Sequence, residues 1–227
     1  MSTINVPSLC VQEMWALFPE TNGLVIEIRC IWPQGISPSL SVKSRCFDSS
    51  GYPDVATFRA AVEEYVTQMN QQGFNLYATL NPLRAGLGRH HYANDGDVLS
   101  RRRLLIDIDR DFGKEHPASD VEIQAARGLA DEIKDYLADL KWPPPVRLMS
   151  GNGHHLVYPL ADLPNTNEVT TAIRGLLSVL KAQFSRDGFS VDTSVSNASR
   201  VTKLPGTFVR RGLEVENRPY RIARIHE

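Results

Sequence analysis

The spacing of apolar side chains switches along the chain between the three-to-four-residue period of helices and the two-residue period of strands. Helical spacing holds from Pro53-Asp54 to Gly73, from Ser119 to the break at Trp142-Pro143, and from Asn165 to Gly188. Strand-like runs cover residues 23–32, 41–47, 74–80, 103–109, 146–150, 154–159, 191–192, 201–204 and 220–225. Because helices and strands do not alternate strictly, the pattern predicts an α+β fold with a mixed or antiparallel sheet.

Two of the expected helices carry polar start signals. Ser119 is followed three residues later by Glu122, which is the spacing of a capping box. In the last helix, Glu168 is expected at the third helical position. The stretch 84–97 holds three glycines and two histidines without any period, so it predicts a long loop, and such loops in compact domains often carry function.

Composition is that of an ordinary globular protein, with 42% hydrophobic and 22% charged residues in 227 and a formal net charge of −1. One domain over 1–227 is expected, with a division into an N-terminal α/β unit (1–97) and a second unit (98–227) that closes the site. The three cysteines form no C-x-x-C pair, which argues against zinc or a disulfide framework and favours a cytoplasmic protein. No apolar run approaches the roughly 20 residues that span a bilayer, so no membrane partner is expected.

The most informative run ends in Asp107 and Asp109. In a strand their Cα atoms lie about 6.6–7 Å apart on one face, while Ile106 and Ile108 point into the core. Two adjacent carboxylates repel each other unless a cation lies between them, and oxygen ligands suit Mg²⁺ or Mn²⁺. The pattern therefore favours a divalent-metal site that handles phosphate, with a solvated strand end as the simpler alternative.

A glycine-containing turn follows at Ser150-Gly151-Asn152-Gly153, before His154 and His155. Glycines permit a tight turn whose backbone N–H groups are open to an anion. Adjacent histidines on a strand face opposite sides, and alternation from Leu156 turns His155 toward the open face and leaves His154 at a core or edge position. The simpler alternative for this turn is an ordinary hairpin.

A third run contains Asp192 and, further on, Arg200 and Lys203 just before a Pro-Gly turn. Arginine gives bidentate recognition of phosphate and lysine a point charge, so the two cations could hold a triphosphate. Taken separately, each of the three residues is more simply explained as a surface residue.

In this order, the three runs resemble the archaeo-eukaryotic primase superfamily, most of all the primase-polymerase domains of plasmids, phages and other mobile elements. The resemblance covers roughly residues 20 to 210. It implies an RNA-recognition-motif-like catalytic sheet joined to the N-terminal α/β unit. It also implies two Mg²⁺ or Mn²⁺ ions on Asp107, Asp109 and Asp192. The nucleotide phosphates would contact a second set: Ser150, Gly151, Asn152, Gly153, His155, Arg200 and Lys203.

The chain departs from the family pattern in two places. Relatives often continue Pro-Gly-Thr with Asn and then Lys, whereas this chain has Phe208-Val209-Arg210, so Arg210 would replace the lysine. The zinc-binding insert of the family is absent, and no zinc is expected. That absence bears on template handling and on the start of primers.

The expected function is that of a DNA primase-polymerase, which joins NTPs or dNTPs on a single-stranded DNA template by two-metal catalysis. A helicase, as a further domain or a separate partner, is the other expected associate. Because the net charge is near zero, template binding is expected to come from local arginines, which are Arg84, Arg89, Arg101, Arg102, Arg103 and Arg210.

Two other functions remain open at this point. A non-catalytic nucleic-acid-binding replication module would keep the fold without the chemistry, and the retained acids argue against it. The other alternative is a metal-dependent nuclease or nickase. A nickase needs two histidines separated by one residue together with a nucleophilic tyrosine, and His154-His155 lacks that spacing.

Overall fold

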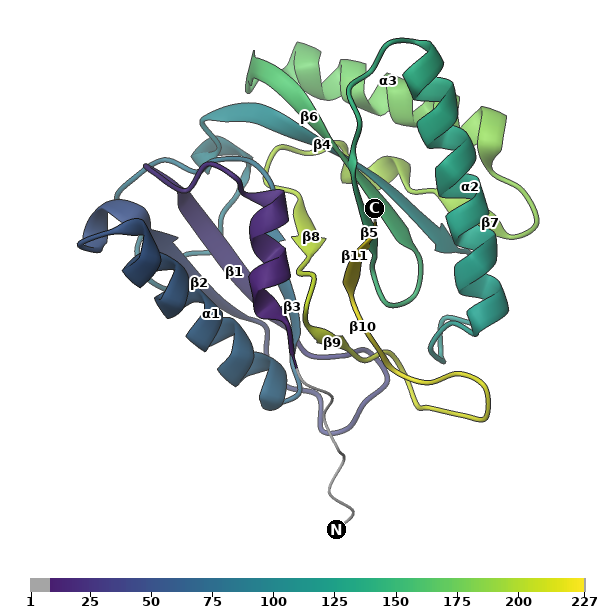
Figure 1. Cartoon of the computed structure of the whole chain (residues 1–227), viewed down its shortest axis with the longest axis horizontal. Coiled ribbons are helices and arrows are strands. Elements are labelled where there is room, and N and C mark those ends of the chain that lie inside the picture. The colour runs from purple at the N-terminus through teal and green to yellow at the C-terminus, as the bar shows by residue number, and fades with distance from the viewer. Residues whose placement is uncertain (1–8, 227) are drawn as a thin grey trace.

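Two antiparallel sheets form the frame of the molecule in the computed structural model, which describes residues 9–226 (Figure 1). The first has the strand order β2-β1-β3-β8. Its strands are β1 (Val25–Ile31), β2 (Lys43–Asp48), β3 (Asn75–Thr79) and β8 (Val201–Lys203). The helix α1 (Val55–Gln71) and the 3₁₀ helix η1 (Val11–Leu17) pack beside this sheet, and Asp54 caps α1 by accepting from the Thr57 amide.

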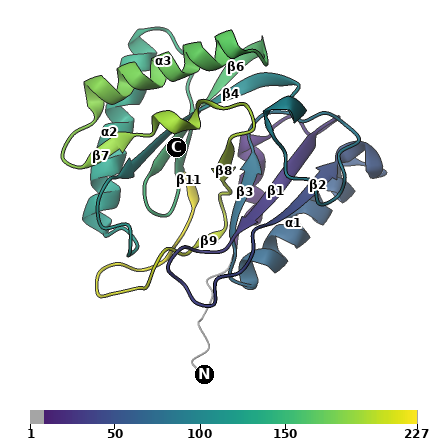
Figure 2. The same cartoon turned by 180° about the vertical axis from the view of Figure 1, so that it is seen from behind.

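The second sheet has the order β11-β5-β6-β4-β7. Its strands are β4 (Ser100–Arg110), β5 (Val146–Met149), β6 (His154–Pro164), β7 (Phe189–Val191) and β11 (Arg224–His226). The helices α2 (Asp120–Asp139) and α3 (Asn167–Phe184) lie together on the far side of this sheet from the first one, as both views show (Figures 1 and 2). Within residues 9–226, no helix is long and apolar enough to cross a membrane.

The remaining elements are short. A two-stranded ribbon pairs β9 (Phe208–Val209) with β10 (Arg221–Ile222). Three 3₁₀ turns complete the order: η2 (Ser49–Gly51), η3 (Asp95–Asp97) and η4 (Thr193–Ser196). The 84–97 loop expected from the sequence is present apart from η3, and the buried Asp97 carboxylate anchors it through the side chains of Arg84 and His91.

The expected boundary at residue 97 does not separate the two sheets. β8 comes from the C-terminal half of the chain, yet it pairs with β3 and completes the first sheet. Asn70 on α1 likewise bonds both the N–H and the carbonyl of Phe208. One continuous apolar core runs from η1 through both sheets to Leu204. The antiparallel α+β fold class predicted from the sequence is confirmed.

Several element boundaries differ from the sequence-based prediction. The capping box of Ser119 and Glu122 is confirmed. However, α3 begins after Thr166, whose side chain accepts from the Val169 amide, so Glu168 is the second helical residue rather than the third. The helix ends at Phe184, before Gly188, because the backbone becomes extended at Ser185, where ψ is 128°. The Ser185 hydroxyl accepts from the Val191 amide.

Three features of the connecting segments were not predicted. The apolar pattern did not predict η1 or β9. The single strand expected over 220–225 is divided into β10 and β11 at Ala223. Ala223 still bonds to the segment that carries β9, because its amide donates to the Thr207 carbonyl and its own carbonyl accepts from the Gly206 amide. From Arg224 onward the chain pairs with β5 instead.

Candidate active site between the two sheets

A cavity of about 400 Å³ opens between the two sheets. Its walls come from both: β3 and β8 of the first sheet, and β4 and β6 of the second. Half of the candidate site residues from the sequence line it, namely Asp107, Asp109, Ser150, Asn152, His155, Arg200, Lys203 and Arg210. Residues separated by more than a hundred positions therefore meet in one cavity.

Strand alternation places the two acids as predicted. Asp107 and Asp109 line the cavity, whereas Ile106 and Ile108 are fully buried on the opposite face of β4. On β3 the same alternation turns Asn75 toward the cavity and its neighbours toward the core. The sheet thus presents two carboxylates on one face by its pleat alone.

Asp107 lies directly opposite His155 in the β4–β6 ladder. The Nε2 atom of His155 is 3.4 Å from Asp107 Oδ1, and its Nδ1 atom is 2.9 Å from Thr202 Oγ1. Burial disfavours the charged carboxylate, but the charges of His155, Arg200 and Arg211 outweigh it and hold the pKa of Asp107 below its usual range. Asp107 is therefore held as an anion beside His155, Arg200 and Arg211.

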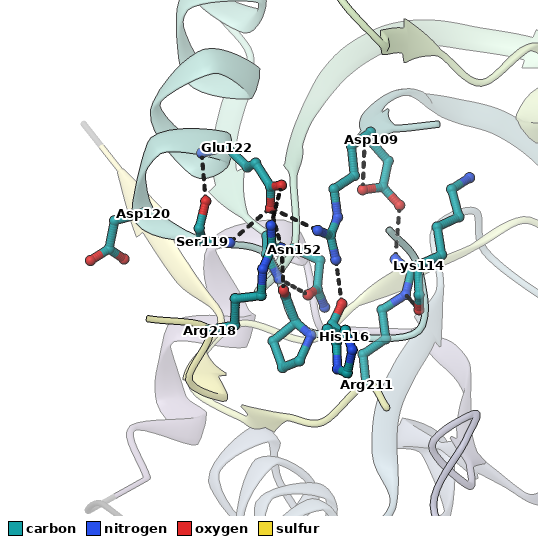
Figure 3. Close-up of polar contacts among 12 residues, drawn as sticks. Asp109, Lys114, His116, Ser119, Asp120, Glu122, Asn152, Arg211 and Arg218 are labelled. Carbon is teal, nitrogen blue, oxygen red and sulfur yellow. Dashed lines mark hydrogen bonds and ion pairs between the residues drawn. The ribbon is translucent and has the colours of Figure 1, made fainter. Parts of the chain in front are cut away.

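Asp109 lies on the same face of β4 as Asp107, but its pKa shifts in the opposite direction. Burial and the neighbouring Asp107 charge raise its pKa above the usual range, and Arg211 only partly offsets them. Its Oδ1 accepts from the Arg110 amide at 2.9 Å, and its Oδ2 lies 3.0 Å from Arg211 Nη1 (Figure 3). In the sequence analysis Arg211 was not among the site residues, because nothing near it in sequence indicated an acid partner.

Asp192, the third expected metal ligand, is not among the residues that line the cavity. Its carboxylate caps η4 and accepts from the amide and the hydroxyl of Ser194 at 2.8 and 2.9 Å. Its backbone is nevertheless adjacent, since the Asp192 amide donates to the Asp107 carbonyl at 2.9 Å. In residues 9–226 no three carboxylate, imidazole or thiol groups lie close enough to hold one ion. The metal role of Asp192 stays a prediction.

The glycine turn packs closely against neighbouring strands, whereas the anion-binding hypothesis expected open backbone N–H groups there. A Cβ atom on Gly153 would lie 2.2 Å from the Ile108 carbonyl, and one on Gly151, at φ +98°, would lie 2.7 Å from Val209. The Ser150 amide donates to the Gly153 carbonyl, and the Gly151 amide points at the Met149 sulfur. The two glycines are thus explained by close approach to β4 and β9, and those two amides are already engaged. Ser150 and Asn152 are the turn residues that line the cavity.

Lys203 is a buried cation that faces the cavity. Only 5% of it is exposed, and its Nζ atom lies 3.7 Å from the centre of the Tyr77 ring, which is its register partner across β3 and β8. Burial, together with the nearby Arg211 charge, lowers the pKa of Lys203 to about 7. Arg200 lies nearby with its guanidinium on the Asn197 side chain and the Ser194 carbonyl.

The arginines expected to bind a template occupy different environments. Arg101 is only 2% exposed, and its guanidinium donates to the Ser196 carbonyl at 2.7 Å. This burial argues against the expected contact with DNA, and the residue lies at a point where the β4–β6 register shifts between Arg101 and Arg103. The template role of Arg101 stays a prediction. Arg103 is half-buried over the Phe18 ring, whereas Arg102 is exposed and paired with Asp162.

Three further arginines are more accessible or closer to the cavity. Arg84 is exposed and paired with Asp97, and Arg89 is exposed on the same loop. Arg210 lines the cavity over the Phe208 ring. For Arg84, Arg89, Arg102, Arg103 and Arg210, a template contact stays a prediction.

The arrangement of the two sheets around the cavity defines the class of fold of this chain. No protein family matches the sequence, and no curated protein matches it either. Solved structures do match: the AEP domain of the cyanophage S-2L primase-polymerase (PrimPol) has a TM-score of 0.55 at 15% identity, covering 97% of this chain and 91% of that one. The fold is thus that of an archaeo-eukaryotic primase-type domain, as the sequence motifs predicted.

Two further structures share this fold. The primase RepB′ matches at a TM-score of 0.50 and 11% identity, over 96% of this chain and 55% of that one. The polymerase domain of Mycobacterium tuberculosis ligase D, solved in complex with DNA, matches at a TM-score of 0.50 and 18% identity, over 88% of this chain and 76% of that one. At these identities the likeness concerns the fold, and the argument for activity depends on the cavity.

Proposed function

We propose that this chain is a DNA primase-polymerase domain that adds nucleotides to a strand on a single-stranded DNA template. The observation that carries the proposal is the cavity itself, in which two carboxylates of one strand face a histidine, an arginine and a buried lysine contributed by other segments. Acids beside cations in one cavity suit a substrate that carries both metal ions and phosphates. The primase-polymerase fold of the structural neighbours supports the same reading.

The donor set fits a divalent cation at the two acids. Asp107 and Asp109 offer hard oxygen ligands on one face of β4. A cation between them would offset the repulsion of their like charges. Asp192 would join them if its carboxylate left Ser194, since its backbone is already bonded to Asp107. Mg²⁺ or Mn²⁺ bound there would activate the attacking hydroxyl and neutralise the leaving group.

The other residues bind and orient the substrates. The 3′-hydroxyl of the growing strand attacks the α-phosphorus of the incoming nucleotide, and the bond to the bridging oxygen breaks, so that pyrophosphate leaves. His155, Arg200 and Lys203 would hold the triphosphate in line for this displacement. The chain itself supplies no nucleophile, so positioning and charge neutralisation carry the rate.

The test uses a primer–template, labelled nucleotides and Mn²⁺ or Mg²⁺. The proposal predicts template-dependent extension, with NTPs and dNTPs compared in parallel and an unprimed template added to detect de novo synthesis. Cutting of the template would indicate a nuclease, and binding without chemistry would indicate a non-catalytic module; either result contradicts the proposal. Asp139→Asn, at an exposed position of α2 that does not line the cavity, serves as the matched control for changes at Asp107 and Asp109.

A further inference from the structure

Arg211 places a permanent positive charge on one of the two acids. Its Nη1 atom lies 3.0 Å from Asp109 Oδ2, and its Nε donates to the Lys114 carbonyl at 3.0 Å (Figure 3). The Arg211 side chain is only 20% exposed, and the residue lines the same cavity as Asp107, His155 and Lys203. The guanidinium thus occupies a position beside the carboxylate where a metal ion would be attracted.

The segment that carries Arg211 is held by contacts from three parts of the chain. The amide of the next residue, Gly212, donates to the Gln34 carbonyl at 2.9 Å, and its carbonyl accepts from the Tyr220 hydroxyl at 2.6 Å. A Cβ atom at Gly212 would lie 1.7 Å from the Glu115 carbonyl, so only glycine fits there. The backbone of Arg211 is therefore fixed beside the cavity, while its long side chain can change partner by rotation about its own bonds.

Asp109 has both oxygens engaged in this arrangement. Oδ1 accepts from the Arg110 amide at 2.9 Å, and Oδ2 is paired with Arg211. A divalent ion at this carboxylate would meet a guanidinium charge at close range, and two cations in a part-buried cavity repel strongly. Ion binding and the Arg211–Asp109 pair therefore compete for the same oxygen.

We propose that Arg211 is a positioning residue that holds Asp109 in the nucleotide-free protein, and that it exchanges this acid for the triphosphate when a divalent ion binds. The inference rests on the proposed function and deepens it. Once released, the guanidinium remains at a cavity that Arg200 and Lys203 also line, where a phosphate group offers it bidentate hydrogen bonds. The two acids would then bind the metal ion together with the nucleotide rather than the metal ion alone.

The test is Mn²⁺ binding to the nucleotide-free protein, measured by calorimetry, so its outcome does not depend on polymerisation. Removal of the competing charge in Arg211→Gln should tighten Mn²⁺ binding by about tenfold or more, and Arg211→Lys, which keeps the charge, should stay within about threefold of the wild type. Arg210→Gln is the matched control, because Arg210 lines the cavity but donates to the Asn70 carbonyl instead of an acid. Asp109→Asn should remove the gain, which locates the ion.

A second measurement uses the wild-type protein and so does not depend on how the variants fold. Titration with Mg²⁺ and a nucleotide should shift the Nη–H resonances of Arg211, because the partner of Nη1 changes from Asp109 to phosphate. Mn²⁺ affinity in Arg211→Gln that is unchanged, weaker or absent, or an Arg211 resonance that stays in place at saturation, would overturn the proposal. A protein that shows the predicted Mn²⁺ gain without extending primers would contradict the proposed function instead.

Discussion

His155 and Asp107 face each other across the β4–β6 ladder, with Nε2 3.4 Å from Oδ1, while the adjacent His154 points to the other side and stacks on His226. One register thus decides which of two consecutive histidines belongs to the cavity. A slip of one residue would exchange them, because side chains alternate with a period of two. The glycine turn fixes this register by packing Gly153 against the Ile108 carbonyl.

The first prediction concerns nucleotide binding by His155 and Arg200. His155→Ala and Arg200→Ala should each raise the apparent KM for nucleotide by roughly ten- to a hundredfold, since charge-assisted hydrogen bonds contribute about 1.5–3 kcal/mol each. His154→Ala should leave KM nearly unchanged, because His154 does not line the cavity. Steady-state nucleotide titrations measure all three. A larger effect from His154 than from His155 would show that the observed register does not operate in the active enzyme.

The second prediction concerns the buried lysine. Burial holds the pKa of Lys203 at about 7, whereas the pKa of an unfolded lysine is about 10.4. The folded protein therefore bears the cost of a buried charge below pH 7, and this cost is relieved as the pH rises from 7 toward the unfolded value. Lys203→Met should raise the melting temperature at pH 6 and give a smaller gain at pH 9, measured without metal or nucleotide. An equal gain at both values would contradict a depressed pKa.

The third prediction concerns the ion-pair network at the start of α2. The Glu122 carboxylate accepts from Ser119 and pairs with Arg110 and Arg218, so its pKa is about 2 even though burial alone would raise it (Figure 3). This contribution to stability is present above about pH 4.5 and is lost as the pH falls toward 2. Glu122→Gln should cost about 3–5 kcal/mol at pH 7, because the fully buried Arg110 loses its partner.

Denaturant unfolding at several pH values checks this network. The difference in unfolding free energy between wild type and Glu122→Gln should shrink between pH 5 and pH 2. Asp120→Asn is the comparison, since Asp120 begins the same helix but its side chain is 88% exposed, and it should change stability by less than about 1 kcal/mol. Equal effects of the two substitutions would argue against a structural role for the buried pair.

The fourth prediction separates two adjacent arginines of β4. Arg101 donates to the Ser196 carbonyl inside the protein, whereas Arg102 is exposed beside Asp162. Arg101→Met should lower the unfolding free energy by about 2 kcal/mol through its lost charged hydrogen bonds, and leave the salt dependence of DNA binding unchanged. Arg102→Ala should cost under about 1 kcal/mol. A flatter salt slope in folded Arg101→Met would restore the template role that its burial argues against.

Local pattern was sufficient to predict much of this molecule. The strand that carries Asp107 and Asp109, the direction of His155 and the start of α2 each depend on alternation or capping within a few residues. These signals are local, so a single sequence contains them. The order of the motifs then indicated the fold that the structural neighbours share.

The parts that were missed depend on contacts between distant segments. Arg211 meets Asp109 across 102 positions, and Tyr77 meets Lys203 only because β8 joins the first sheet. Asp192 was expected to be the third metal ligand; its carboxylate caps η4 here, and the metal role stays a prediction. Alternation on β3 could have indicated that Tyr77 lies on the same face as Asn75, but not which cavity that face lines.

The most direct test of the account is single-turnover incorporation of a labelled nucleotide on a primed template with Mn²⁺. Wild type and Asp139→Asn should extend the primer, while Asp107→Asn and Asp109→Asn should lose extension by at least about a thousandfold and keep their circular dichroism spectra. Extension by either cavity variant at a rate near that of the wild type would contradict the assignment of these two acids as the centre of the site.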